Sequence, residues 1–92
     1  MAVNNRLRPV AGYLVEILGE EIVLFHPELL KIAHLNRTAA LIWGLCDGER
    51  SEADICVLLA DAYPDSAEDM KQDVRDTISL FKSIGALEEG EI

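Results

Sequence analysis

Between residues 12 and 35 the apolar residues follow the spacing of short β-strands. The reversal Gly19-Glu20 and the proline Pro27 divide this part of the chain into three runs, because Pro27 cannot donate to a strand ladder and Gly19 favours a tight turn. The three runs are residues 13–18, 22–25 and 30–35. Short runs joined by short turns predict a three-stranded antiparallel meander.

The apolar spacing then changes to that of helices. Asn36 is suited to cap a first helix, which Asp47-Gly48 ends. Ser51 and Asp54 resemble a capping box at the start of a second helix, which ends at Tyr63-Pro64. The expected buried positions are Ala39, Ile42 and Trp43 in the first helix and Ile55, Leu58, Leu59 and Ala62 in the second.

A third and longest helix is expected from Asp65 or Ser66 to about Ile84. Gly85 is placed as the residue that follows its end, and Ala86–Glu88 is expected to form a short closing strand. The buried stripe of this helix is expected to contain Met70, Val74, Ile78, Phe81 and Ile84. Three strands followed by three helices predict an α+β fold of the winged helix-turn-helix kind.

A chain of 92 residues, half of them apolar, suits one domain with one core. We expect that domain over residues 13–88, after a flexible arm over residues 1–12 and before a tail over residues 89–92. We find neither a secretory signal nor an apolar run long enough to span a bilayer. We therefore expect no membrane partner and a cytoplasmic protein whose two cysteines are free thiols.

The charge balance argues against nucleic acid as a partner. Eight Lys and Arg residues stand against 17 Asp and Glu residues, a net charge of −9, whereas duplex binding requires cations that displace counterions. A DNA-reading winged helix is the main physical rival, but the second helix has no Lys or Arg between Glu52 and Pro64. Against this acidic background, Lys71, Arg75 and Lys82 share one edge of the third helix beside Ile78. They are either ordinary surface charges or a cationic rim for an acidic peptide.

We predict no enzyme, no metal site and no cofactor. The residues able to bind zinc, His26, His34, Cys46 and Cys56, lack the close pairs of structural zinc sites. No local signature supplies a nucleophile with a base and an oxyanion site. The six glycines are dispersed, so no phosphate-binding loop is evident.

Two motifs together resemble the PqqD family. The first runs from His26-Pro27 to Leu35-Asn36-Arg37-Thr38-Ala39 and on to Trp43, and the second is Cys46-Asp47-Gly48-Glu49-Arg50. The closing Gly85-Ala86-Leu87 matches as well, so the resemblance covers roughly residues 13–88. The chain departs from the common pattern at Ser51-Glu52-Ala53, where Thr and an apolar residue are frequent. We expect the Asp47–Arg50 segment to be structural, with Arg50 paired to a nearby carboxylate or carbonyl.

The resemblance implies a peptide recognition element for ribosomally made, modified peptides. Such domains bind the leader segment of a precursor as an added strand and present the precursor to a tailoring enzyme. In the pyrroloquinoline quinone (PQQ) branch that enzyme is a radical S-adenosylmethionine (radical SAM) protein. Carried to this chain by position, the expected peptide-binding residues are Leu30, Lys31, Ile32, Ala33, His34 and Leu35 on the third strand, with Lys71, Arg75, Ile78 and Lys82 on the helix wall.

Two tests and one further alternative accompany this hypothesis. Replacing Arg75 and Lys82 with Glu is expected to weaken leader binding, and proline at Ala33 is expected to block it if that N–H faces the free edge. The alternative to peptide recognition, besides the DNA-binding regulator, is a dimerising adaptor whose strand edge pairs with a second copy. We expect a monomer or a weak homodimer, and the product of the pathway stays open.

Overall fold

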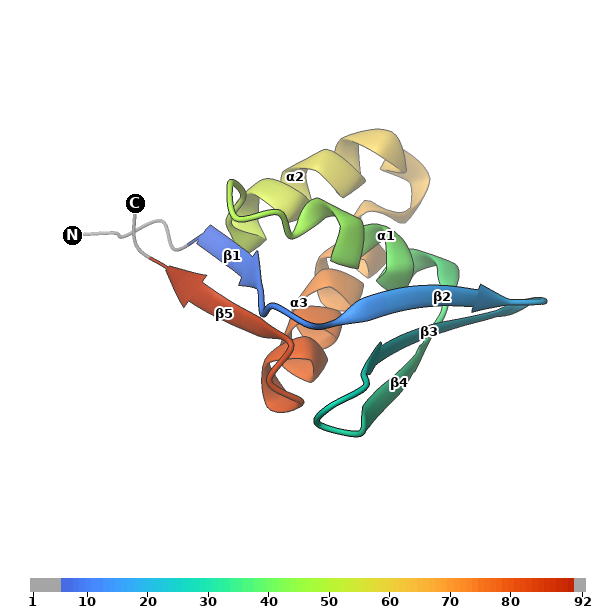
Figure 1. Cartoon of the computed structure of the whole chain (residues 1–92). Coiled ribbons are helices and arrows are strands. Elements are labelled where there is room, and N and C mark those ends of the chain that lie inside the picture. Colours follow the sequence, from blue (N-terminus) through green and yellow to red (C-terminus); the bar gives the residue numbers. More distant parts are fainter. Residues whose placement is uncertain (1–5, 91–92) are drawn as a thin grey trace.

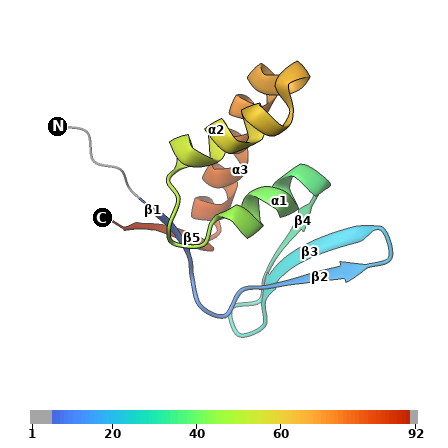
Figure 2. The same cartoon turned by 90° about the horizontal axis from the view of Figure 1, so that it is seen from above.

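The computed structural model describes residues 6–90, which form two small sheets and a three-helix layer (Figure 1). The strands are β1 (Arg6–Pro9), β2 (Leu14–Leu18), β3 (Glu21–His26), β4 (Lys31–Leu35) and β5 (Leu87–Gly90). The helices are α1 (Arg37–Leu45), α2 (Glu52–Ala62) and α3 (Ala67–Ser83), with a 3-10 turn at Pro64–Ser66 before α3. The three helices lie together on one side of the larger sheet (Figure 2). The predicted α+β class is confirmed.

The larger sheet is the predicted antiparallel meander, in the order β2-β3-β4. Leu18 lies opposite Glu21 across the two-residue turn Gly19-Glu20, and Gly19 has a φ of 65° that suits glycine. His26 lies opposite Lys31 across the second turn. The third strand begins at Lys31 and not at Leu30, because Leu30 takes a left-handed φ of 55° and belongs to the turn.

The smaller sheet corrects the expectation of a flexible arm over residues 1–12. β1 pairs with β5 in antiparallel register, with Arg8 opposite Glu88. The side chain of Leu7 is 1% exposed and belongs to the core. Residues 89 and 90, expected in a tail, lie in β5. Residues 6–9 of the expected arm and residues 89–90 of the expected tail are therefore strand residues, while residues 1–5 and 91–92 lie outside the described part.

The Asp47–Arg50 segment holds the second edge of β1. The Leu7 N–H donates to the Arg50 carbonyl and the Gly48 N–H donates to the Leu7 carbonyl, each at 2.8 Å. Arg50 in turn donates to the Asp47 carboxylate at 2.7 Å and to the Leu45 carbonyl at 3.5 Å. The predicted structural role of this segment, and the predicted partners of Arg50, are confirmed.

The helix ends follow their capping residues. The Asn36 side chain accepts from the Ala39 N–H at 2.7 Å, and Ser51 and Asp54 form a complete capping box at the start of α2. Gly85, with a φ of 76°, follows α3. The predicted face of α2 is wrong in part, because Leu58 and Ala62 are exposed. The buried residues of α2 are Ile55 and Leu59, which lie one helical turn apart, so the buried face is narrower than predicted.

The core joins the sheets to the helices. Leu24 from β3, Ile42 from α1 and Phe81 from α3 are fully buried. The Trp43 ring packs edge-to-face on Phe81, with 5.2 Å between the ring centres. The Tyr13 hydroxyl donates to the Ile84 carbonyl at 2.8 Å and so ties the start of β2 to the end of α3. No helix within residues 6–90 is long and apolar enough to cross a membrane.

The capping box predicts a pH dependence of stability. Hydrogen bonds from Ser51 lower the pKa of the Asp54 carboxyl from its usual 3.8, with smaller contributions from Arg6 and Arg50. Because the folded-state pKa lies below the unfolded one, the stabilisation is complete above about pH 4 and is lost as the pH falls through the folded pKa. Urea denaturation of Asp54→Asn and of the unchanged protein between pH 6 and pH 2 is expected to show a smaller acid loss in the variant. Equal acid losses would contradict this role.

Candidate peptide-binding site

Among the described residues, β4 is an edge strand of the larger sheet and has backbone groups that no strand pairs with on its outer side. In the two-residue β2–β3 turn, Leu18 and Glu21 form a hydrogen-bonded pair, so alternate residues of β3 bond to β2 and to β4. The register of β3 with β4 then directs the backbone groups of Lys31, Ala33 and Leu35 inward to β3. The N–H and C=O groups of Ile32 and His34 point away from the sheet. Within residues 6–90, no other strand pairs with this side of β4.

We call the backbone groups of Ile32 and His34 the β4 edge. This geometry corrects the test proposed at Ala33, because the Ala33 N–H faces β3 and not the free edge. Proline at Ala33 would therefore damage the sheet itself. Proline at Ile32 or His34 removes an outward N–H and leaves the internal ladder intact.

The predicted peptide-binding residues divide into exposed and buried sets. Lys31, Ile32 and His34 are exposed on β4, and Leu30 is 88% exposed in the turn that precedes it. Ala33 is half-buried against the core, and Leu35 is buried within it. The Leu35 side chain therefore lies on the inner face of β4, which packs against α1 and the core.

The predicted helix wall also changes. The Ile78 side chain is 1% exposed, so it supports the wall from inside the core and is not at the surface. Lys71 pairs with Glu68 at 3.5 Å. Lys71 and Arg75 stand close enough to Cys56 on α2 to act on its thiol, and Lys82 pairs with Glu89 of β5. The three cations thus share one side of α3, and the groups with which they interact lie on α3 itself, α2 and β5.

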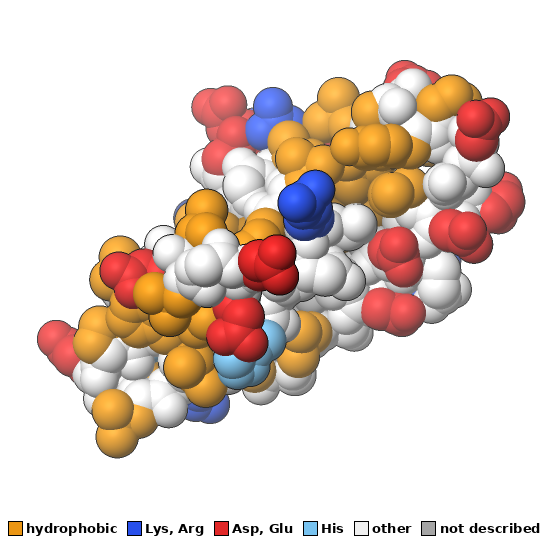
Figure 3. Space-filling view, turned by 90° about the vertical axis from the view of Figure 1, so that its right-hand side faces the viewer, with side chains coloured by type: hydrophobic (Ala, Val, Ile, Leu, Met, Phe, Trp, Pro, Cys, Tyr) orange, Lys and Arg blue, Asp and Glu red, His pale blue; other side chains and the backbone are white. Residues whose placement is uncertain are grey.

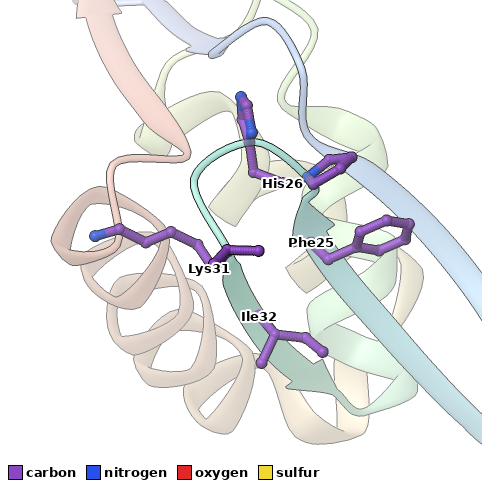
Figure 4. A pocket seen from close by; sticks show the side chains of 6 residues that line it. Phe25, His26, Lys31 and Ile32 are labelled. Atoms are coloured by element: carbon purple, nitrogen blue, oxygen red, sulfur yellow. The ribbon is translucent and has the colours of Figure 1, made fainter.

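A shallow apolar pocket lies at the turn end of the β4 edge. Its volume is about 260 Å³. Its lining residues are Phe25, His26, Pro27, Leu30, Lys31 and Ile32. Phe25 and Ile32 are cross-strand partners whose side chains point to the same side, while Lys31 points the other way (Figure 4). We call this the turn pocket.

Sequence reasoning missed the β3 side of the turn pocket, namely Phe25, His26 and Pro27. The turn length carried the signal, because four residues between His26 and Lys31 place Phe25 directly opposite Ile32. His26 itself has a structural position. Its Nδ1 accepts from the Leu29 N–H at 3.2 Å, and its ring packs edge-on against Tyr13 at 5.0 Å.

The two thiols have raised pKa values. Burial, with a contribution from the Asp47 carboxylate, raises the pKa of the Cys46 thiol to about 12. Burial also raises the pKa of Cys56, with Glu52 adding to the effect and Arg75 and Lys71 opposing it. Both side chains are free thiols that stay protonated at neutral pH. Within residues 6–90, no three His, Cys, Asp or Glu side chains are grouped so that they would hold a metal ion.

Comparisons with known proteins find a family and a solved structure that are similar to this chain. The family model of coenzyme PQQ synthesis protein D (PqqD) matches residues 21–87. A solved structure described as "TbiB1 in Complex with the TbiA(beta) Leader Peptide" shares the fold, with a TM-score of 0.70 and 18% sequence identity. The match covers 88% of this chain and 94% of that chain. No curated protein sequence matches the chain.

Proposed function

Because the chain belongs to the PqqD family, we propose that it is a non-catalytic domain that binds the leader segment of a ribosomally made precursor peptide. The leader adds to β4 as a further strand, and the domain then presents the precursor to a peptide-modifying enzyme. In the PQQ branch of the family, that enzyme is of the radical SAM type. The two free thiols suit action in the reducing cytoplasm.

The open β4 edge is the observation that carries this proposal. The outward N–H and C=O groups of Ile32 and His34 match the hydrogen-bonding pattern of an incoming extended chain. Backbone pairing supplies affinity without regard to sequence, and side-chain pockets supply specificity. The solved structure TbiB1, which shares this fold, is a complex with a leader peptide.

The turn pocket gives the added strand a preferred residue type. Its lining is mainly apolar, with Phe25, Pro27, Leu30 and Ile32 contributing hydrocarbon surface. A guest residue that follows the Phe25–Ile32 row on the same face meets this pocket first. We therefore expect an apolar or aromatic leader residue there. A short peptide buries about 1,000 Å² or less, which favours micromolar affinity.

The β4 edge is tested directly by backbone chemistry. We expect the precursor's leader peptide to bind with a Kd near 10 µM or below in calorimetry, about −7 kcal/mol. A leader N-methylated at one amide facing β4 is expected to bind roughly tenfold more weakly, since each lost hydrogen bond costs about 1 kcal/mol and the methyl group adds a clash. Methylation of the next amide along the leader, which faces solvent, serves as the matched control. Equal losses at both positions would exclude strand addition.

The cations of α3 remain a separate part of the proposal. We propose that Lys71, Arg75 and Lys82 attract an acidic stretch of the precursor, with little effect on the strand pairing itself. The double variant Arg75→Glu and Lys82→Glu is expected to weaken leader binding severalfold, because exposed ion pairs contribute only about 0.2–1 kcal/mol each. The loss is expected to shrink in high salt. An unchanged Kd at low salt would remove these cations from the site.

The rival functions have less support in this fold. The exposed surface of α2 contains the carboxylates of Asp54 and Asp61, which repel phosphates, and the apolar side chains of Val57 and Leu58, which cannot bind them. A dimer through the β4 edge would use the same backbone groups as the guest. Light scattering with and without leader peptide separates the two cases, because a guest that competes with a second copy lowers the measured mass.

A further inference from the structure

The β2–β3 hairpin projects beyond the helices and exposes apolar side chains on both faces. Figures 1 and 2 both show its tip extending past α1. All five residues of β2 are exposed, and four of them are aliphatic. Ile17 is 72% exposed and Leu18 is 57% exposed. Aliphatic side chains that are exposed together on one projecting element often mark a surface that contacts another protein, whereas single exposed aliphatic residues are ordinary.

Within residues 6–90, no strand pairs with the outer edge of β2 either. The register that joins Leu14, Glu16 and Leu18 to β3 leaves the backbone groups of Val15 and Ile17 pointing away from the sheet. Natural edge strands are usually protected by lysine, proline or a bulge. β2 has only one charged residue, Glu16, and no proline. This edge lies on the opposite side of the sheet from the β4 edge.

The charges around the hairpin specify the kind of partner. Glu16, Glu20 and Glu21 lie in or next to the apolar stretch, and residues 12–25 include no Lys or Arg. Seen from the tip, acidic side chains lie beside hydrophobic ones at the surface (Figure 3). A second copy would bring the same carboxylates together, and both copies have a net charge of −9. A surface with Lys or Arg around an apolar centre is complementary to the hairpin.

We propose that the β2–β3 hairpin is a docking arm for a partner protein whose contact surface is apolar and bordered by Lys or Arg. The identity of that partner rests on the proposed function, which makes it the peptide-modifying enzyme. The larger sheet then joins two different chains, with the precursor at β4 and the enzyme at β2. The hairpin is small, so the contact is weak and exchanges rapidly.

The arm is tested on the full chain with the purified peptide-modifying enzyme that acts on the same precursor. The double variant Ile17→Ser and Leu18→Ser is expected to weaken enzyme binding at least tenfold and to leave the Kd for the leader peptide unchanged. The matched control is Val57→Ser on α2, an equally exposed aliphatic residue, which is expected to bind the enzyme normally. Circular dichroism and urea denaturation verify that the variants fold.

The charge complementarity has its own variant. Glu20→Lys with Glu21→Lys is expected to weaken enzyme binding at low salt and to flatten its salt dependence, whereas Asp61→Lys on α2 has neither effect. Unchanged enzyme binding in both hairpin variants would overturn the proposal, as would a wild-type chain that does not bind the enzyme. A concentration-dependent doubling of mass that Ile17→Ser removes would assign the arm to a second copy and also overturn it. Failure of the leader peptide to bind refutes the proposed function and leaves the enzyme measurement to decide the arm.

Discussion

Proline at His34 is expected to abolish measurable leader binding while the domain stays folded. The His34 N–H points away from β3, so its removal leaves the internal ladder complete. The variant loses one hydrogen bond to the guest, about 1 kcal/mol. Its ring also projects into the space where the guest backbone must lie, so we expect a loss of at least about 3 kcal/mol, more than a hundredfold in Kd. Calorimetry with the leader peptide measures this loss, and Ile32→Pro is expected to behave in the same way.

Ala33→Pro is the matched control for this experiment. Its N–H faces β3, so proline there removes a ladder bond inside the sheet and is expected to destabilise the domain by about 3 kcal/mol or more. His34→Ala separates the backbone from the imidazole, because it keeps the N–H and removes only the side chain. Full leader binding by His34→Pro would show that the guest does not pair with β4 in the proposed register.

Replacing Leu7 with Ala is expected to cost about 2–5 kcal/mol of unfolding free energy, a large part of the roughly 5–15 kcal/mol of a typical domain. Leu7 is 1% exposed, its backbone N–H and C=O bond to residues 50 and 48, and its strand pairs with β5. Urea denaturation followed by circular dichroism measures the change. An N-terminal segment that was loose in solution would make the substitution almost neutral.

Leu18→Ala provides the control for Leu7→Ala. It removes the same side chain from an exposed position in a regular strand, so we expect a change within about 0.5 kcal/mol. A loss for Leu7→Ala no larger than that of Leu18→Ala would contradict the docking of β1. Because both variants lose the same side-chain atoms, the difference between their losses of unfolding free energy measures the effect of burial.

The meander and the helices were predictable because each depends on local signals. Gly19-Glu20, Pro27, Asn36 and the capping residues Ser51 and Asp54 act within a few positions of themselves. The pairing of β1 with β5 joins residues about 80 positions apart, and no local pattern specifies such a contact. The alternation of Arg6, Leu7 and Arg8 was a faint signal, since Arg8 lies opposite Glu88.

The candidate site was predictable as a strand, but its chemistry was not. Periodicity predicted a strand over residues 30–35, of which Lys31–Leu35 is a strand, yet only the hairpin register shows that the backbone groups of Ile32 and His34 face outward. The helical wheel of α3 placed Ile78 beside the cations, and burial then removed it from the surface. A wheel gives the angles of side chains around one helix and does not identify the neighbouring element that each side chain contacts. The place of Arg75 beside the third strand was carried over from the family by position, whereas in the structure Arg75 is close enough to Cys56 of α2 to oppose the rise in the pKa of that thiol.

The antiparallel pairing of β1 with β5 brings Arg6 and Gly90 side by side at one end of the molecule. A longer polypeptide would therefore have two adjacent attachment points for this domain, and a short connection at each would suffice to splice it into a surface loop. Neither connection would pass near Ile32 or His34, so the β4 edge would stay accessible in such a fusion. Tethering of this kind would raise the local concentration of a captured substrate at a neighbouring catalyst without any new contact.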